Sequence, residues 1–139
     1  MSSVEPLEVV RAVYDAFEVW DHASIRDLLA PDVQWHQAPS AVPAAGRVLA
    51  TADAVLQSVA RPLEEDWDGF TEQLEHLMPA GDRVVVTGTY HGTYRANGRR
   101  LAAPFCHLWT VADGQVAVFR QFTDTAAFVE VTRTESQPR

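Results

Sequence analysis

Cysteine is almost absent from this chain, which has only one, Cys106, among its 139 residues. A single cysteine excludes an internal disulfide and any zinc site built from several cysteines. Because Cys106 falls in a predicted strand, we interpret it as a small apolar residue rather than a nucleophile. The five histidines, at positions 22, 36, 76, 91 and 107, show neither His-x-His nor His-Glu-x-x-His spacing. The sequence therefore predicts no metal site.

Basic residues are also scarce, since 11 arginines and no lysine stand against 19 acidic residues and give a net charge of −8. Nucleic acids bind to basic surfaces, and so do anionic membranes. No apolar run reaches the roughly 20 residues of a membrane helix. The start of the chain lacks the basic and apolar regions of a signal peptide. We therefore expect a cytoplasmic protein that binds neither nucleic acid nor membranes.

Sequence motifs for phosphate binding and for serine nucleophiles are missing as well. Neither a glycine-rich phosphate loop nor a nucleophile elbow occurs, and we expect no cofactor. Apolar residues nevertheless make up 47% of the chain, which is enough for a folded core. The length fits one domain, which we assign to residues 1–131, followed by a polar tail over residues 132–139.

Two turn signals organise the last third of the chain. The dipeptides Asn97-Gly98 and Asp113-Gly114 lie between alternating apolar runs, where residues that tolerate positive φ favour tight hairpins. They predict three consecutive antiparallel strands. The strands are expected over Asp82 to Tyr94, Arg100 to Val111 and Gln115 to Phe122.

The first half predicts three helices and one short strand. Apolar residues at helical spacing, with a proline in the first turn, predict a helix over Pro6 to Trp20. Asp21 and Thr51 can each cap a further helix, and Pro31 is expected to end the helix that follows Asp21. The short strand is predicted between these two helices, over Val33 to Gln37.

The stretch from Phe70 to Met78 fits both a helix and a strand. A strand would place Glu72 and His76 as polar residues among apolar neighbours on one face. We favour the strand, because a fourth strand makes a stabler sheet than three. Helices gathered before an antiparallel sheet indicate the α+β class. We expect a strongly curved sheet, with helices over its concave face, that encloses a pocket.

Five short segments carry a resemblance to a known family. They are LLAPDVQW at 28–35, GDRVVV at 81–86, PFCHLW at 104–109, DGQV at 113–116 and FTDTA at 122–126. With these segments the chain resembles the nuclear transport factor 2-like superfamily, and more narrowly its SnoaL-like polyketide cyclase branch, over roughly residues 6–128. The resemblance implies a cystatin-like cone with a single apolar pocket, and a homodimer formed through the outer face of the sheet.

The resemblance also implies roles for three residues. Asp124, which ends the last strand, matches the general acid/base of an intramolecular aldol closure. His107 matches a histidine that lines the same pocket, and Tyr14 matches an aromatic residue on the first helix that closes the cavity. Each residue has a plainer interpretation: Asp124 as a helix cap, His107 as a hydrogen-bonded core residue, and Tyr14 as core packing.

Strand alternation places Arg120, Phe122 and Asp124 on one face of the last strand. If that face lines the pocket, desolvation should raise the pKa of Asp124. Gln37 can orient a carbonyl, and Arg120 can pair with an acid in the cavity or reach solvent at a dimer edge. We expect the substrate-binding walls to come from aromatic residues, namely Trp35, Phe105, Trp109 and Phe122.

We therefore predict cofactor-free acid/base catalysis, of cyclase or isomerase type, on a hydrophobic substrate that carries a carbonyl group. Asp124 would move the proton, His107 would assist it, and Tyr14 would polarise the oxygen that gains charge. Two alternatives stay open. One is a non-catalytic module for small-ligand binding or dimerisation. The other is an epoxide hydrolase-like enzyme that uses Arg120 with Asp124.

Overall fold

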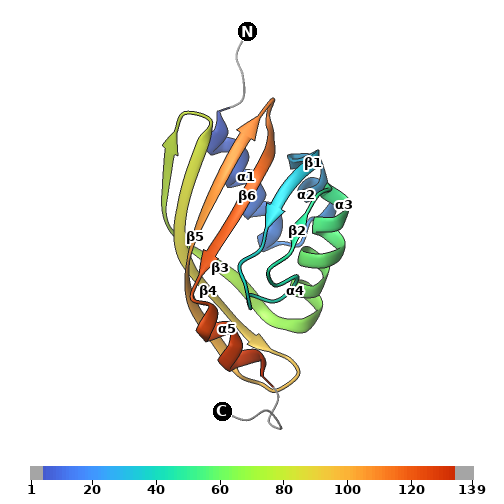
Figure 1. Cartoon of the computed structure of the whole chain (residues 1–139), viewed down its shortest axis with the longest axis vertical. Helices are drawn as coiled ribbons and strands as arrows, with labels where there is room; N and C mark the ends of the chain where they lie inside the picture. The colour runs from blue at the N-terminus through green and yellow to red at the C-terminus, as the bar shows by residue number, and fades with distance from the viewer. Residues whose placement is uncertain (1–4, 134–139) are drawn as a thin grey trace.

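The structure is a computed structural model that describes residues 5–133, and in that range helices pack over one side of a six-stranded sheet (Figure 1). The α+β class expected from the sequence is confirmed. The strands follow the order β2-β1-β6-β5-β4-β3 across the sheet. Neighbours are antiparallel except β1 and β6, which run parallel. The strands are β1 (Leu29–His36), β2 (Val48–Leu49), β3 (Trp67–Ala80), β4 (Arg83–Tyr94), β5 (Arg100–Ala112) and β6 (Gln115–Thr123).

The helices begin close to the expected residues. Asp21 accepts a hydrogen bond from the backbone N–H of Ser24 at 3.2 Å, and Thr51 accepts one from Ala54 at 3.0 Å, so both predicted caps are confirmed. The second helix ends three residues earlier than the position of Pro31, which lies inside β1. The helices are α1 (Pro6–Glu18), α2 (His22–Leu28), α3 (Ala52–Val55), the π-helix η1 (Leu56–Ala60), α4 (Arg61–Asp66) and α5 (Thr125–Thr132).

The two predicted hairpins form as expected. Asp113 and Gly114 both take positive φ, at 53° and 76°, as a tight two-residue hairpin requires. Gly98 has a φ of 73° at the other turn. The segment that fitted both helix and strand is strand β3, which pairs with β4 along most of its length.

Strand β6 contains a one-residue bulge that changes which side chains face the core. Thr110 of β5 pairs with Val118, and the next residue, Val111, pairs with Val116, so Ala117 is the extra residue. A bulge reverses the alternation of faces beyond it. Val116 is buried before the bulge, and Phe119 is buried after it at 2% exposure. From Phe119 onward, each residue of β6 therefore lies on the opposite face of the sheet from the one that simple alternation counted from Val116 would give it.

Gly88 of β4 allows two strands and an aromatic ring to come close together. A Cβ built at this position would overlap the carbonyl oxygen of Gln73 on β3 and lie 2.6 Å from the ring of Phe105. Only glycine leaves room for this approach. Phe105 then stacks on Tyr90 with ring centroids 4.4 Å apart, and on His107 at 4.1 Å. Gly88 thereby leaves room for the stacked rings of Tyr90, Phe105 and His107.

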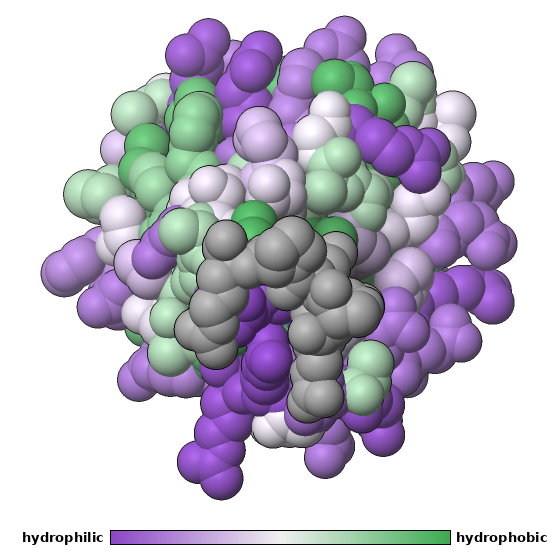
Figure 2. Space-filling view, turned by 60° about the horizontal axis from the view of Figure 1, so that its bottom comes forward, coloured by the Kyte–Doolittle hydropathy of each residue, from purple (hydrophilic) through white to green (hydrophobic). Residues whose placement is uncertain are grey.

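The face of the domain at the lower end of Figure 1 is mostly polar. Seen from the lower end of Figure 1, hydrophilic residues predominate and apolar residues form separate small groups (Figure 2). None of the helices in residues 5–133 has both the length and the hydropathy that a membrane crossing needs. Within the same residues, no three His, Cys, Asp or Glu side chains come together as a metal-binding set. The polar tail expected at 132–139 lies outside the described residues except for Thr132, which ends α5, and residue 133.

Candidate functional site

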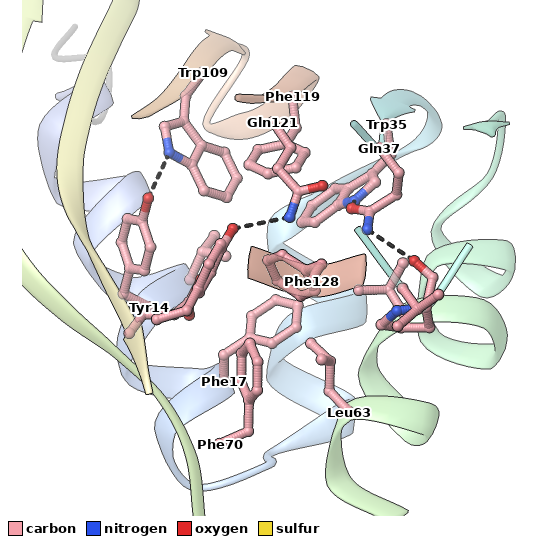
Figure 3. A pocket seen from close by; sticks show the side chains of 16 residues that line it. Tyr14, Phe17, Trp35, Gln37, Leu63, Phe70, Trp109, Phe119, Gln121 and Phe128 are labelled. Carbon is pink, nitrogen blue, oxygen red and sulfur yellow. Dashed lines mark hydrogen bonds between the residues drawn. The ribbon is translucent and has the colours of Figure 1, made fainter. Parts of the chain in front are cut away.

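A narrow apolar pocket lies between the helices and the concave face of the sheet (Figure 3). Its unfilled space is about 440 Å³ with the opening included, but only about 30 Å³ can hold the centre of a water molecule. A guest with a ring therefore needs lining side chains to move apart. The pocket is lined by Val13, Tyr14, Phe17, Trp35, Gln37, Val42, Pro43, Val59, Leu63, Phe70, Glu72, Tyr90, Trp109, Phe119, Gln121 and Phe128.

Two tyrosines in the pocket wall are joined by a buried histidine. His107 on β5 is 1% exposed. Its Nδ1 lies 2.6 Å from the hydroxyl of Tyr14 on α1, and its Nε2 is hydrogen-bonded to the hydroxyl of Tyr90 on β4. The three side chains come from a helix and two adjacent strands. Their contact therefore depends on the packing of α1 across the sheet.

The two tyrosine oxygens at the ends of this hydrogen-bonded chain each accept a further hydrogen bond. The indole N–H of Trp109 donates to the Tyr14 oxygen at 3.0 Å, and the side-chain amide of Gln121 donates to the Tyr90 oxygen at 2.9 Å (Figure 3). The other end of the Gln121 side chain accepts a hydrogen bond from the backbone N–H of Ala38 at 3.0 Å. That bond fixes the amide so that its NH₂ group faces Tyr90.

Burial keeps this network uncharged. Desolvation lowers the pKa of His107 well below its ordinary value, so the imidazole is neutral at pH 7. Desolvation also raises the pKa of both tyrosines well above 10, with the nearby charge of Glu72 adding to the effect. The hydroxyls are therefore protonated hydrogen-bond donors.

Glu72 on β3 is the one carboxylic acid among the described residues that line the pocket. It sits directly across from Tyr90 in the β3–β4 pairing. Desolvation raises its pKa to about 8, and the charge of Glu18 contributes to the rise. Glu18 itself accepts hydrogen bonds from the Thr71 hydroxyl, at 2.9 and 3.1 Å for its two oxygens. A carboxyl group with a pKa near neutrality can both take up and release a proton.

The structure places four of the predicted site residues in the pocket wall: Tyr14, Trp35, Gln37 and Trp109. His107 and Phe105 lie behind that wall, where Phe105 stacks on the imidazole. The catalytic and binding roles of these residues stay predictions.

Gln37 is not free to orient a carbonyl group. Its side-chain oxygen accepts a hydrogen bond from the Trp35 indole at 2.8 Å. Its NH₂ group donates to the carbonyl oxygens of Pro43 at 2.9 Å and of Ala41 at 3.4 Å. The side chain instead holds the 38–47 loop against β1, and Gln37 contributes to the shape of the pocket.

The prediction that Arg120 and Phe122 line the pocket is wrong. Arg120 is exposed and Phe122 is 53% exposed, on the outer face of the sheet. The bulge at Ala117 is the reason, because it reverses the alternation of β6. Gln121, which alternation from Val116 had placed outside, lies in the pocket.

The prediction that Asp124 sits in apolar surroundings is also wrong. Asp124 is exposed, lies outside the pocket lining, and is the N-cap of α5, where its Oδ1 accepts a hydrogen bond from the Ala127 N–H at 3.2 Å. The helix-cap interpretation therefore holds. It also removes the epoxide hydrolase-like relay, because both Arg120 and Asp124 lie away from the pocket.

We expect Asp124→Ala to lower stability by about 0.5–2 kcal/mol, because the first turn of α5 loses its cap. Asp124→Asn is the matched control, since asparagine caps about as well as aspartate. Chemical denaturation of both variants measures the effect. Proton transfer in the pocket should change less than about threefold in either variant. A loss of that activity in Asp124→Asn at unchanged stability would restore a catalytic role to this carboxylate.

Sequence reasoning missed three pocket residues that carry polar groups: Glu72, Tyr90 and Gln121. Glu72 gave a usable signal, because a charged residue on an otherwise apolar strand face is uncommon. Tyr90 alternates with the buried Val84 and Val86, which made it look like ordinary core. Gln121 could not be found without knowledge of the bulge.

Comparisons with known proteins point to one family. A family model described as a SnoaL-like domain matches residues 10–119. Among solved structures, an NTF2-like protein from Burkholderia thailandensis is 34% identical, with a TM-score of 0.86, over 96% of this chain and 100% of that chain. No curated protein matches the chain.

Two further solved structures share the fold. IdmH, a putative polyketide cyclase from Streptomyces antibioticus, is 20% identical with a TM-score of 0.78, over 91% of this chain and 97% of that chain. TerC, co-crystallised with polyporic acid, is 26% identical with a TM-score of 0.78, over 91% of this chain and 96% of that chain.

Proposed function

The chain belongs to the SnoaL-like domain family, and from this premise and the pocket geometry we propose an enzyme that moves protons on a hydrophobic, carbonyl-bearing small molecule without a cofactor. One observation carries the proposal. Glu72, with a pKa of about 8, lines an aromatic pocket together with Tyr14 and Tyr90. The pairing of a base with hydrogen-bond donors is what enolisation of a ketone requires.

In the proposed reaction, the Glu72 carboxylate takes a proton from the carbon next to the carbonyl group. The electron pair of the broken C–H bond moves into the C–C bond, and the carbonyl oxygen gains negative charge. A tyrosine hydroxyl donates a hydrogen bond to that oxygen. In an isomerisation, the proton returns from Glu72 to another carbon. In an aldol closure, the enolate carbon attacks a second carbonyl group, whose oxygen then takes the proton.

The lining of the pocket supports a flat and uncharged substrate. Eight of the described lining residues are aromatic: Tyr14, Phe17, Trp35, Phe70, Tyr90, Trp109, Phe119 and Phe128. None of the described lining residues is lysine or arginine, so a phosphate or carboxylate group would have no counter-charge there. The co-crystallisation of TerC with polyporic acid and the description of IdmH as a putative polyketide cyclase are in line with such a substrate.

The test is deuterium incorporation from heavy water into 2-tetralone at the carbon next to its carbonyl group, followed by NMR. The proposal expects the protein to accelerate this exchange and the Glu72→Gln variant to lose the acceleration. A passive binding module, the second candidate, would bind 2-tetralone without any acceleration. That outcome would overturn the proposed enzyme.

We also propose a homodimer formed through the outer face of the sheet. On this face Phe122 of β6 is exposed, and it pairs with the partly buried Cys106 of the neighbouring strand β5. Analytical ultracentrifugation should show twice the chain mass of 15.4 kDa. Phe122→Glu is expected to weaken the dimer at least tenfold, because it buries an unpaired charge. Val129→Glu is the matched control on α5, where Val129 is 49% exposed. A dimer unaffected by Phe122→Glu would place the interface elsewhere.

The cytoplasmic location expected from the sequence stays a prediction.

A further inference from the structure

The hydrogen bonds around His107 leave one proton unused, and its position depends on the histidine tautomer. A tyrosine oxygen carries one proton and two lone pairs, and a neutral imidazole has one N–H donor and one bare nitrogen. Trp109 occupies one lone pair of Tyr14, and Gln121 occupies one lone pair of Tyr90. Both of these contacts are fixed, because the indole can only donate and the amide is oriented by Ala38.

Two arrangements satisfy this network equally well. With the proton on Nε2, Tyr14 donates to Nδ1, the imidazole donates to Tyr90, and the Tyr90 proton is free. With the proton on Nδ1, Tyr90 donates to Nε2, the imidazole donates to Tyr14, and the Tyr14 proton is free. Tyr14 and Tyr90 are both among the residues that line the pocket, whereas His107 joins their hydroxyl groups from behind the lining. The pocket therefore offers one hydroxyl proton at a time.

We propose that Tyr14, His107 and Tyr90 form a proton wire that binds a substrate with a hydroxyl and a carbonyl oxygen pointing apart on one conjugated ring system. This inference rests on the proposed function only in placing a carbonyl compound in the pocket. Tyr14 and Tyr90 contact the two substrate oxygens, and His107 is a positioning residue. In each tautomer, one tyrosine donates to the carbonyl oxygen while the other accepts from the hydroxyl group.

The proton transfer along this wire is balanced. The substrate hydroxyl gives its proton to the Tyr14 oxygen as the Tyr14 proton passes to Nδ1. The Nε2 proton passes to the Tyr90 oxygen as the Tyr90 proton passes to the substrate carbonyl oxygen. The electron pairs of the conjugated system shift, so that the former hydroxyl becomes the carbonyl. No charge is created, and His107 ends as the other tautomer with all its hydrogen bonds made.

The tautomer of His107 is directly measurable from the ¹⁵N shifts of its ring nitrogens. The wild-type protein should show both nitrogens at averaged values, because the two tautomers exchange. Tyr14→Phe removes the partner of Nδ1 and should fix the proton on Nε2, where it still meets Tyr90. Tyr90→Phe should fix the proton on Nδ1. The same tautomer in both variants, or an imidazole protonated on both nitrogens, would overturn the wire.

Binding of three small probes tests the substrate class. We expect 4′-hydroxyacetophenone, whose hydroxyl group is conjugated with its carbonyl group, to bind the wild-type protein about tenfold more tightly than acetophenone, which has only the carbonyl. Either single Tyr→Phe variant should remove that advantage, because only one of the two substrate oxygens then keeps a partner. Ethylbenzene, without oxygen, should bind all variants equally. If the hydroxyl-bearing probe still binds more tightly than acetophenone in either variant, the two tyrosines do not each contact one substrate oxygen, and the proposal is contradicted. If acetophenone does not bind the wild-type protein, the proposed function fails, while the ¹⁵N shifts still decide the wire.

Discussion

Replacing Glu72 with glutamine should slow deuterium exchange into 2-tetralone by at least about 100-fold. A positioned general base contributes about 10²–10⁴-fold to such a reaction. Glutamine keeps the shape of the side chain but cannot take up a proton. The measurement is the NMR rate of signal loss at the carbon next to the carbonyl, at about pH 9, where Glu72 is ionised in the free protein.

Glu75→Gln is the matched control, because Glu75 lies on the same strand and is exposed. The change in charge is the same, but the exchange rate should stay within about twofold of wild type. The kcat/KM of the wild-type protein should rise with pH through about 8 and then level off, because the carboxylate form of Glu72 is the base. Equal rates in Glu72→Gln and wild type would remove Glu72 from the mechanism.

Glu72→Gln should also make the protein more stable at alkaline pH. Glu72 has a pKa of about 8 in the folded chain against an ordinary value of 4.5. Between these two values the folded state binds a proton that the unfolded state has released, so wild-type stability falls as pH rises. Above about pH 8 the folded protein holds a partly buried anion. The neutral glutamine avoids this cost.

Between pH 5 and pH 9, the free energy of unfolding of Glu72→Gln should rise by about 2–4 kcal/mol relative to that of the wild-type protein. This figure is smaller than the full pKa shift implies, because Glu72 is only half-buried and solvent screens its charge. Urea denaturation at the two pH values measures it. Glu75→Gln should show no comparable dependence on pH. A difference between Glu72→Gln and wild type that stays constant from pH 5 to pH 9 would mean that the Glu72 carboxyl is not desolvated.

Local rules predicted much of this fold. The caps at Asp21 and Thr51 and the turns at Gly98 and Asp113-Gly114 depend on residues within a few positions of one another, and all of them formed. The same local rule correctly described Asp124, whose side chain caps α5. At that position, capping chemistry was a better guide than the catalytic role implied by the resemblance.

The interior of the pocket depends on events that local patterns do not contain. The bulge at Ala117 arises from pairing between β5 and β6, and it exchanged Phe122 for Gln121 on the inner face. The His107 network needs α1 to cross the sheet, so that Tyr14 meets a residue 93 positions away in the sequence. A burial pattern can place Tyr90 and His107 in the core, but it cannot show that their polar atoms meet.

The most direct test of this account is the ionisation of Glu72 itself. The ¹³C shift of its side-chain carboxyl carbon, followed by NMR from about pH 3 to pH 10 in labelled protein, gives the pKa without any substrate. If Glu72 is the proposed base, the wild-type protein should show a midpoint near 8 that disappears in Glu72→Gln. A midpoint near 4.5, the ordinary value for this acid, would show a hydrated side chain and contradict the proposed base.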